Sequence, residues 1–339
     1  MSDRVRSFLT ESVRAGLFPG ASYSFGSRDR VWTGSVGMLG YGDEWPAVDE
    51  GTRFDLASLT KVVATTPVAH RLWLDSALKL DAKVSDVLPE FRHREVTVEH
   101  LLRHESGLPA YNDLARTCGT PAEVWSALTA LELERAPGEA TVYSCIGFIV
   151  LQRLLERLTG RSLDKLADES VFGRLAMSQT SFGPLAGAVD DVAPTGRLEP
   201  WHGSGRGWLQ GKVHDPLAYL QGGVSGNAGL FGTSNDLAKY CQSVLSDENS
   251  WQEWVAREAD HERGLGWDIK SEQGSSAGAT MSLASFGHTG FTGTSIWIDP
   301  VAGVFAVLLT NAVHPLGGRT DLRDVRSRYC DLVISAFGD

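Results

Sequence analysis

Lysine is scarce in this chain, and basic residues as a group are outnumbered. Only seven of the 339 residues are lysines, and 42 acidic residues against 31 basic ones leave a formal net charge of −11. A protein that binds nucleic acid needs a stripe of basic side chains to neutralise phosphates. The composition therefore argues against nucleic acid as a partner.

Cysteine and histidine lack the spacing of metal sites. The cysteines lie far apart and form no CxxC pair, so the sequence predicts neither a zinc site nor a disulfide framework. The histidines lack HExxH spacing, and no glycine-rich phosphate loop is present. We therefore expect no metal and no cofactor.

Long apolar runs are also absent. No run approaches the roughly 20 residues that span a bilayer, and the N-terminal residues lack an apolar stretch of about 7–15 residues like that of a secretory signal. We expect a soluble, reduced, cytoplasmic protein that acts on a small molecule and has no membrane partner. The sequence leaves its oligomeric state open.

The apolar spacing predicts a mixed α/β (α+β) fold. Both ends of the chain read as helix and hairpin, with Ala21, Tyr23 and Phe25 alternating with serines as in a half-buried strand. The second hairpin ends in the strand VFAVLLTN, which is apolar on both faces and therefore central in a sheet. Helical spacing occupies the middle of the chain, at residues 60–80, 97–103, 121–134, 144–160 and 162–175.

The change from strand-like to helical spacing predicts that the chain is divided into two structural units. Residues 1–64 and 232–339 are expected to build an antiparallel sheet flanked by helices, and residues 65–231 a mainly helical subdomain. The segment 178–230 is rich in Gly and Trp and is expected to be a long loop. Its glycines in GGVSGNAGLFG predict close approach of backbones. The sequence does not say whether this loop moves over a site.

A Ser-x-x-Lys tetrad offers a nucleophile, because a lysine three residues later on a helix can take the serine proton. The tetrad occurs at Ser58–Lys61, Ser76–Lys79 and Ser162–Lys165. Ser162 reads as a helix N-cap, and Ser76 reads as part of the polar face of a helix. Ser58 has apolar neighbours, so burial would lower the pKa of Lys61 toward that of a useful base. An N-cap serine with a solvated lysine is the alternative.

Two later segments hold further candidates. Tyr143 follows a Pro-Gly turn and starts an apolar helix, where a phenol beside a lysine could relay a proton; a core tyrosine is the alternative. His288 lies in FGHTGFTGTS, whose glycines at a strand edge would let a ligand approach a free N–H. A surface-loop histidine is the alternative there.

These segments together carry a resemblance. Ser58-x-x-Lys61, Tyr143-Ser144-x and His288-Thr289-Gly290 occur in the order of the serine β-lactamase and penicillin-binding protein superfamily. FDLASLTK, LLRHESGLP, GLFGT and GHTGFTGTSIWIDP resemble segments of class C β-lactamases and of family VIII carboxylesterases. The resemblance runs from about residue 15 to 335 and implies the β-lactamase/transpeptidase-like fold.

The resemblance also implies roles. Ser58 would be the nucleophile, while Lys61 and Tyr143 would share the work of general base and general acid. His288 stands where many relatives have a lysine and would orient Tyr143 and the substrate. The backbone N–H groups of Ser58 and Phe291 would form the oxyanion hole.

Departures from the family pattern bear on the substrate. Cys145 stands where β-lactamases and peptidases have an asparagine, and a thiol is a poor substitute for an amide. With His288 in place of a lysine, the attraction for a substrate carboxylate would depend on pH near neutrality. Other residues expected at the substrate are Thr289, Gly290, Trp208 and Asn227. Trp208 belongs to a group with Trp201 and Trp267 that either lines an acyl pocket or packs the loop.

The sequence thus predicts a serine hydrolase that acts on a small ester or amide through an acyl-Ser58 intermediate. A β-lactamase or D-alanyl-D-alanine peptidase is one alternative, and a sensor that is acylated without turnover is another. Cys145 paired with His288 is a less favoured nucleophile. Asp215, which follows His214 and precedes a proline, reads as a turn or cap residue.

Overall fold

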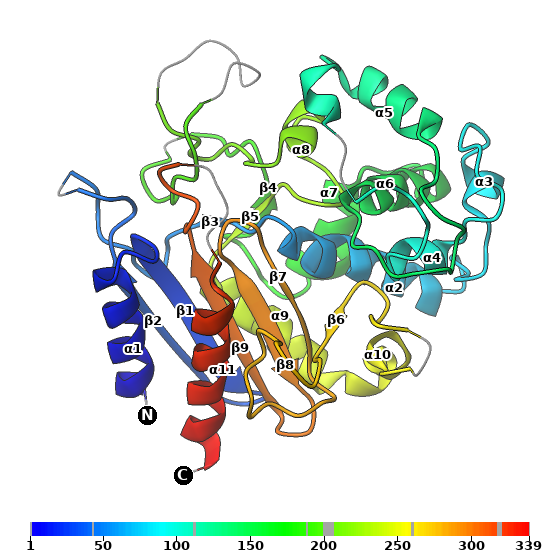
Figure 1. Ribbon diagram of the computed structural model, residues 1–339. Helices are drawn as coiled ribbons and strands as arrows, with labels where there is room; N and C mark the ends of the chain where they lie inside the picture. Colours follow the sequence, from blue (N-terminus) through cyan, green and yellow to red (C-terminus); the bar gives the residue numbers. More distant parts are fainter. Residues whose placement is uncertain are drawn as a thin grey trace.

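Both ends of the chain build one antiparallel sheet, as the computed structural model in Figure 1 shows. The structure describes residues 2–42, 44–110, 113–187, 189–198, 207–258, 261–316 and 321–338. The strand order is β2-β1-β9-β8-β7-β6. These strands are β1 (Gly20–Ser27), β2 (Val31–Gly37), β6 (Asp268–Ile269), β7 (Phe286–Thr289), β8 (Ser295–Asp299) and β9 (Val304–Thr310).

Strand β9 lies inside the sheet, between β1 and β8. It pairs antiparallel with both, and all seven of its residues are buried. Strands β1 and β2 pair as a hairpin, with Gly26 opposite Val31. The two predicted hairpins and the central position of the last strand are therefore confirmed.

Helices cover both faces of this sheet (Figure 1). On one face, α1 (Ser2–Arg14) and α11 (Arg323–Gly338) share an apolar cluster with Tyr23 and Phe25. On the other, the start of α9 (Ser234–Ser246) is hydrogen-bonded to β1: Ser24 Oγ donates to Ser234 O at 2.8 Å, and the Ser22 and Ser234 hydroxyls are 2.7 Å apart. The prediction of a half-buried first strand is wrong, because α9 covers its serine face.

The helical part of the molecule packs around α6 (Cys145–Thr159). Its N-cap is Ser144, whose hydroxyl accepts from Gly147 N, and its C-cap is Gly160 at φ +69°. These bounds confirm the helix predicted at 144–160. The other elements of this part are η1 (Lys61–Thr65), α2 (Thr66–Leu74), α3 (Val84–Val87), α4 (Val98–Leu102), η2 (Leu114–Arg116), α5 (Pro121–Ala130), α7 (Leu163–Ala167), η3 (Asp168–Phe172), α8 (Pro216–Leu220) and α10 (Glu248–Val255).

The helix predicted at 60–80 stops earlier than its apolar pattern suggested. It ends at Leu74, and Ser76 has φ +56°. The N–H groups of Ala77 and Leu78 both donate to Leu72 O, at 2.8 and 3.0 Å, which closes the helix with a left-handed turn. Ser76 therefore lies in a turn and not on a polar helix face, which corrects that prediction. Ser162 is the N-cap of α7, as predicted.

The described part of segment 178–230 is packed and not structureless. It contributes β4 (Ser181–Phe182) and α8, and β4 joins β3 (Phe54–Asp55) and β5 (Leu230–Gly232) in a second sheet of order β3-β5-β4. A Cβ on Gly223 would lie 2.0 Å from Gly183 O, and one on Gly229 would lie 2.0 Å from Gly223 O. The predicted close approach of backbones is confirmed at these glycines.

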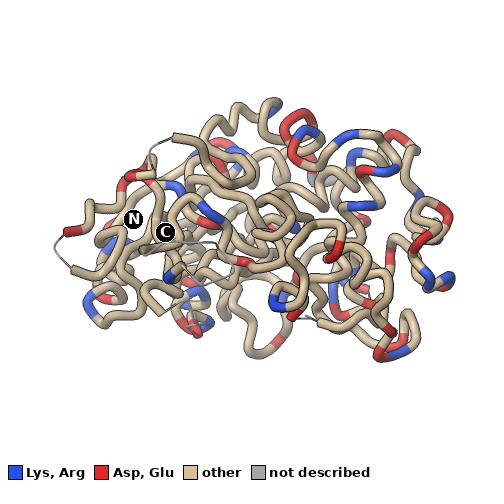
Figure 2. Tube along the Cα trace, turned by 90° about the horizontal axis from the view of Figure 1, so that it is seen from above, with Lys and Arg blue, Asp and Glu red and all other residues tan. Residues whose placement is uncertain are grey.

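Acidic and basic residues lie near one another in many parts of the described trace (Figure 2). Among the residues that the structure describes, no helix combines the length and the apolarity that crossing a membrane requires. The division of the chain at residues 64/65 and 231/232 stays a prediction. Ser58 lies close to this division, between β3 of the small sheet and η1.

Candidate active site

Ser58 lies on a tight turn between strand β3 and the helix that begins with η1. The turn places Ala57 at φ +47°, and the Asp55 carboxylate accepts the Ala57 N–H at 2.8 Å. Asp55 Oδ2 also accepts the His214 N–H at 2.7 Å, so one buried carboxylate ties the turn to the long loop. Burial raises the pKa of Asp55 to about 6. The Ser58 side chain remains partly exposed at this turn.

The loop after His288 is attached to the same turn. Thr292 Oγ1 donates to Asp55 O at 2.7 Å, and Thr294 Oγ1 donates to Leu56 O at 3.1 Å. A Cβ on Gly290 would lie 2.7 Å from Leu56 O, so only glycine fits there. Within the described part of the chain, neither the Ser58 nor the Phe291 N–H donates a hydrogen bond. Two free donors on adjoining segments are what an oxyanion hole requires.

Lys61 is fully buried and points at Ser58. Its ammonium Nζ donates to Ser58 Oγ at 3.0 Å, to Asn227 O at 3.1 Å and to Cys145 Sγ at 3.6 Å. Nζ also lies 4.9 Å from the centroid of the Tyr143 ring, within cation–π range. Of the three tetrads, Ser58–Lys61 is thus the one in which the lysine contacts the serine inside the protein.

The charge state of Lys61 differs from the prediction. Burial lowers its pKa, whereas Cys145 and Tyr143 in their ionised forms raise it, and the net shift of the Lys61 pKa is upward. The expectation that burial alone turns Lys61 into a base is therefore wrong. In the resting protein Lys61 is an ammonium held by a hydroxyl, a carbonyl and a thiol.

Tyr143 precedes α6 and is surrounded by two cations and two histidines. The residue is 36% exposed, and its ring lies 4.6 Å from that of His104 and 5.6 Å from that of His288 between ring centroids. The Arg263 guanidinium lies 5.5 Å from the Tyr143 centroid. Desolvation raises the pKa of Tyr143, against the opposing effect of Lys61. The phenol is therefore protonated at rest, beside the ammonium of Lys61.

His288 lies on β7 in a buried position. Its Nδ1 lies 2.8 Å from the Thr289 carbonyl oxygen, which can only accept, so Nδ1 carries the proton and Nε2 does not. Burial, with Arg263 and Lys61 nearby, holds the pKa of His288 well below its usual value. The expectation of an attraction for carboxylates that varies near neutral pH is wrong, because His288 is uncharged there.

The residues predicted to contact the substrate differ in how they lie relative to Lys61. Cys145 is the first residue of α6 and contacts Lys61, whereas Asn227 reaches Lys61 through its backbone oxygen. The Asn227 side chain is buried and accepts from Ser225 Oγ at 2.7 Å. Thr289 lines the cleft described below.

The tryptophans lie apart from one another. The Trp208 ring lies 4.5 Å from that of His314 and 6.4 Å from that of Trp45, so its contacts do not test its predicted role. Trp267 is buried in the core against Phe286, as a packing residue would be. Trp201 lies outside the described residues. Asp215 caps α8 by accepting from Ala218 N, as predicted.

A cleft of about 1180 Å³ opens beside Tyr143 and Thr289. Basic and acidic side chains share its walls: Arg257, Arg263, Lys270, Arg323 and Arg326, with Glu258, Glu262, Asp268 and Asp321. A ligand in this cleft would meet the site from the side of Tyr143 and Thr289.

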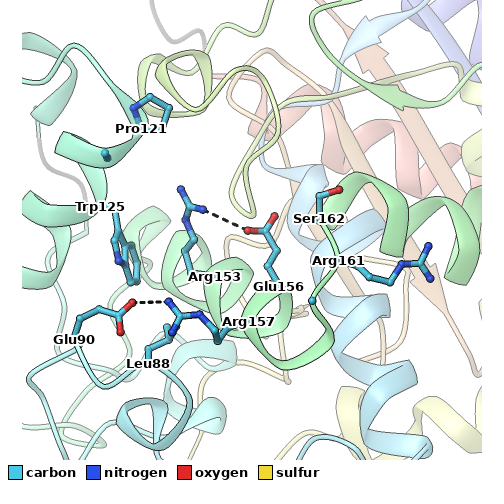
Figure 3. Close-up of a pocket in the computed structure, with 11 residues that line it drawn as sticks. Leu88, Glu90, Pro121, Trp125, Arg153, Glu156, Arg157, Arg161 and Ser162 are labelled. Carbon is cyan, nitrogen blue, oxygen red and sulfur yellow. Dashed lines mark hydrogen bonds and ion pairs between the residues drawn. The ribbon is translucent and has the colours of Figure 1, made fainter.

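A second cavity of about 850 Å³ lies on the helical part (Figure 3). Arg153 lies over the Trp125 ring there and reaches Glu156, and Arg157 pairs with Glu90 at 3.1 Å. Ser58 and Lys61 are not among its lining residues. Ser58 and Lys61 do not line the cleft beside Tyr143 either, but Tyr143 does, so that cleft is the one that adjoins the candidate site.

Two residues of the site were not found by sequence reasoning. His104 lies in LLRHESGLP, which resembles a family segment but was assigned no catalytic or substrate role, and Arg263 lies in a segment without any pattern. Both reach Tyr143 through space, from segments distant in the chain. The positive φ of His104, +61°, is the kind of local feature that marks such a residue, but it is visible only in the structure.

We expect the free energy of unfolding to fall as the pH drops below about 6.5. The pKa values of buried His104 and His288 are held well below normal, so the unfolded chain takes up protons that the native state does not. Each such histidine costs up to about 1.4 kcal/mol per pH unit. Asp55 has the opposite effect. Its pKa of about 6 in the native state lies above its ordinary value. Between these two pH values the folded state binds more protons than the unfolded chain, so this residue raises the free energy of unfolding as the pH falls. Urea unfolding at pH 7.5, 6.5 and 5.5 measures the balance, and a level or rising free energy toward pH 5.5 would contradict it.

Comparison with known proteins identifies the family of the chain. The family described as "Beta-lactamase" matches residues 5–329. The chain is 32% identical to an N-acetylmuramyl-L-alanine amidase of Bacillus subtilis (strain 168), over 78% of the chain and 68% of the relative. It is 29% identical to a "Putative D-alanyl-D-alanine carboxypeptidase" of Escherichia coli (strain K12), over 78% and 70%.

Solved structures show the same fold. One is EstCE1, a hydrolase with promiscuous acyltransferase activity, with a TM-score of 0.74 at 21% identity, over 98% of each chain. Another is a class C β-lactamase, with a TM-score of 0.77 at 18% identity, over 99% of this chain and 97% of the other. The predicted fold and resemblance are confirmed. The chain belongs to the β-lactamase family and is a serine hydrolase of that family.

Proposed function

We propose that the protein hydrolyses small esters, and amides less readily, through an acyl intermediate on Ser58. The observation that carries the proposal is the 3.0 Å contact between Lys61 Nζ and Ser58 Oγ, with Tyr143 beside it. Nucleophile and proton-transfer groups within hydrogen-bond reach are the signature of covalent catalysis.

Acylation follows from these contacts. Ser58 Oγ attacks the acyl carbon and its proton passes into the Tyr143–Lys61 pair, while the carbonyl oxygen becomes negative beside the Ser58 and Phe291 N–H groups. Because both members of the pair are protonated at rest, the pair must release one proton to bulk water before it can accept the proton of Ser58. The pair then protonates the leaving alkoxide, and the same groups activate water for deacylation.

The preference for esters rests on Cys145 and His288. Cys145 presents a thiol where an amide would be needed to bind an acylamide side chain, and a thiol is a weak donor and a weak acceptor. His288 is neutral and presents Nε2 without a proton, so it supplies no cation for a substrate carboxylate. Both features favour an uncharged substrate.

The test is a parallel assay of p-nitrophenyl butyrate and a chromogenic cephalosporin. Ester turnover that exceeds cephalosporin turnover supports the proposal. Efficient cephalosporin hydrolysis would instead establish a β-lactamase. A single stoichiometric burst with either compound would mean that the acyl enzyme is stable, as in a sensor.

A second candidate is the cleavage of a peptide or amide that carries a carboxylate. The arginines of the cleft beside Tyr143 favour it, since Arg263 lies 5.5 Å from that ring. The names of the amidase and carboxypeptidase relatives point in the same direction. Release of D-alanine from a peptide ending in D-Ala-D-Ala, measured beside the ester assay, separates the two candidates.

Cys145→Asn should raise β-lactam turnover relative to ester turnover by roughly tenfold, because an added side-chain hydrogen bond discriminates by about this much or more. The ratio of kcat/KM for the cephalosporin to that for the butyrate ester measures it. Cys118→Asn is the matched control, since Cys118 is also a free, partly exposed cysteine. An unchanged ratio in Cys145→Asn would mean that this position does not select the substrate.

A further inference from the structure

We infer that His104 is a positioning residue that holds Tyr143 in place for proton transfer to and from Ser58. This inference rests on the proposed function, in which Tyr143 takes part in the chemistry. Nothing in the reaction requires His104 to touch the substrate. Its action passes through the backbone and the ring of Tyr143.

His104 binds the chain on both sides of Tyr143. The backbone oxygen of His104 accepts the Val142 N–H at 2.8 Å, and its side-chain Nδ1 accepts the Ser144 N–H at 2.9 Å. The residue before Tyr143 and the residue after it are therefore both attached to one histidine. A tyrosine held at both neighbours has little freedom to move its backbone.

The imidazole also supports the ring of Tyr143. The two ring centroids are 4.6 Å apart, and on α6 the Phe148 ring lies 5.0 Å from the imidazole. His104 is 2% exposed, so its ring is enclosed and cannot swing away. The phenol thus rests on an imidazole that is fixed by a core phenylalanine.

The hydrogen bond from Ser144 fixes the tautomer of His104. Because Nδ1 accepts, the proton must be on Nε2, the reverse of His288, whose Nδ1 donates. Lys61 and Arg263, together with burial, hold the pKa of His104 well below its usual value. His104 is therefore neutral and keeps an acceptor directed at Ser144 over the working pH range.

Substitutions of His104 can distinguish a positioning role from a simple packing role. Asparagine places its amide oxygen close to where histidine has Nδ1, while glutamine places its oxygen one carbon farther, near Nε2. His104→Asn keeps the acceptor for Ser144, whereas His104→Gln and His104→Ala lose it. His70→Asn is the matched control, because His70 is a similarly buried histidine that contacts Trp251 and Ser250.

Turnover is measured with p-nitrophenyl butyrate and divided by the concentration of active sites from burst titration. We expect His104→Ala and His104→Gln to lower kcat by about 100-fold, the cost of a small misplacement of a reacting group. KM should stay within a factor of two or so of the wild-type value, and His104→Asn should regain about tenfold in kcat. His70→Asn should keep wild-type kcat per active site.

Equal losses in the three His104 variants, or a change in KM without a change in kcat, would overturn the inference. Nitrogen-15 NMR of histidine-labelled protein gives a readout besides activity. It should show an Nε2-protonated His104 that keeps this tautomer in Ser58→Ala, and an Nδ1-protonated or charged His104 at pH 7 would also overturn the inference.

Tyr143→Phe, assayed in parallel, separates the two levels of the argument. If Tyr143→Phe keeps wild-type kcat, the proposed role of Tyr143 fails and the inference fails with it. If Tyr143→Phe loses activity while His104→Ala and His104→Gln keep theirs, the proposed function stands and the positioning role alone is overturned.

Discussion

Ser58→Ala should abolish ester turnover, with a loss on the order of 10⁶-fold in kcat, as for removal of a nucleophile from other serine hydrolases. The Ser58 hydroxyl lies 3.0 Å from Lys61 Nζ, so another residue could not easily replace it as the nucleophile. Folding should be retained, since Ser58 is partly exposed on its turn and alanine already occupies the strained position before it. Steady-state turnover and far-ultraviolet circular dichroism measure the two effects.

The matched control is Ser162→Ala, which removes the serine of another Ser-x-x-Lys tetrad. Ser162 caps α7 without a side-chain hydrogen bond, so its loss should change neither activity nor folding appreciably. Wild-type turnover in Ser58→Ala would exclude the acyl-Ser58 mechanism. It would direct attention to Cys145, the other nucleophile in contact with Lys61.

Lys61→Met should lower kcat by about 10³-fold or more, within the range for loss of a general acid–base group. Methionine keeps much of the apolar stem in the buried site but removes the ammonium that donates to Ser58 and to Asn227 O. The phenol of Tyr143 then faces no cation at 4.9 Å, so its pKa rises further and it becomes a weaker acid. Single-turnover acylation by p-nitrophenyl butyrate measures the loss.

Lys79→Met is the control for this substitution, because Lys79 follows Ser76 at the same spacing but lies in a loop. It should acylate at the wild-type rate. If Lys61→Met also acylates at that rate, then Lys61 orients the site without moving a proton, and Tyr143 alone would have to carry the acid–base steps.

Much of the site could be predicted from short strings of residues. Ser58, Lys61, Tyr143 and His288 meet in the structure. The apolar context that distinguished Ser58 from Ser76 also agrees with the structure, because a buried lysine must lie among apolar side chains. The glycines of FGHTGFTGTS predicted a free N–H at this strand edge, and the family resemblance singled out that of Phe291, which donates no hydrogen bond within the described part of the chain.

The charges in the site could not be predicted in this way. Local apolarity correctly indicated that Lys61 is buried, but its pKa is raised by Cys145 and Tyr143, which come from another part of the chain. His288 was expected to titrate near neutrality because that is its ordinary behaviour. Burial and two cations keep it neutral.

The sequence by itself determined the order of the motifs, the two hairpins, the central strand and the helix α6, because these depend on periodicity between near neighbours. The tertiary structure alone decided that α9 covers the serine face of β1, that His104 and Arg263 border Tyr143, and which groups in the site carry charge. The physical reason is that desolvation and Coulomb interactions act through space. Their values are set by residues that only folding brings together.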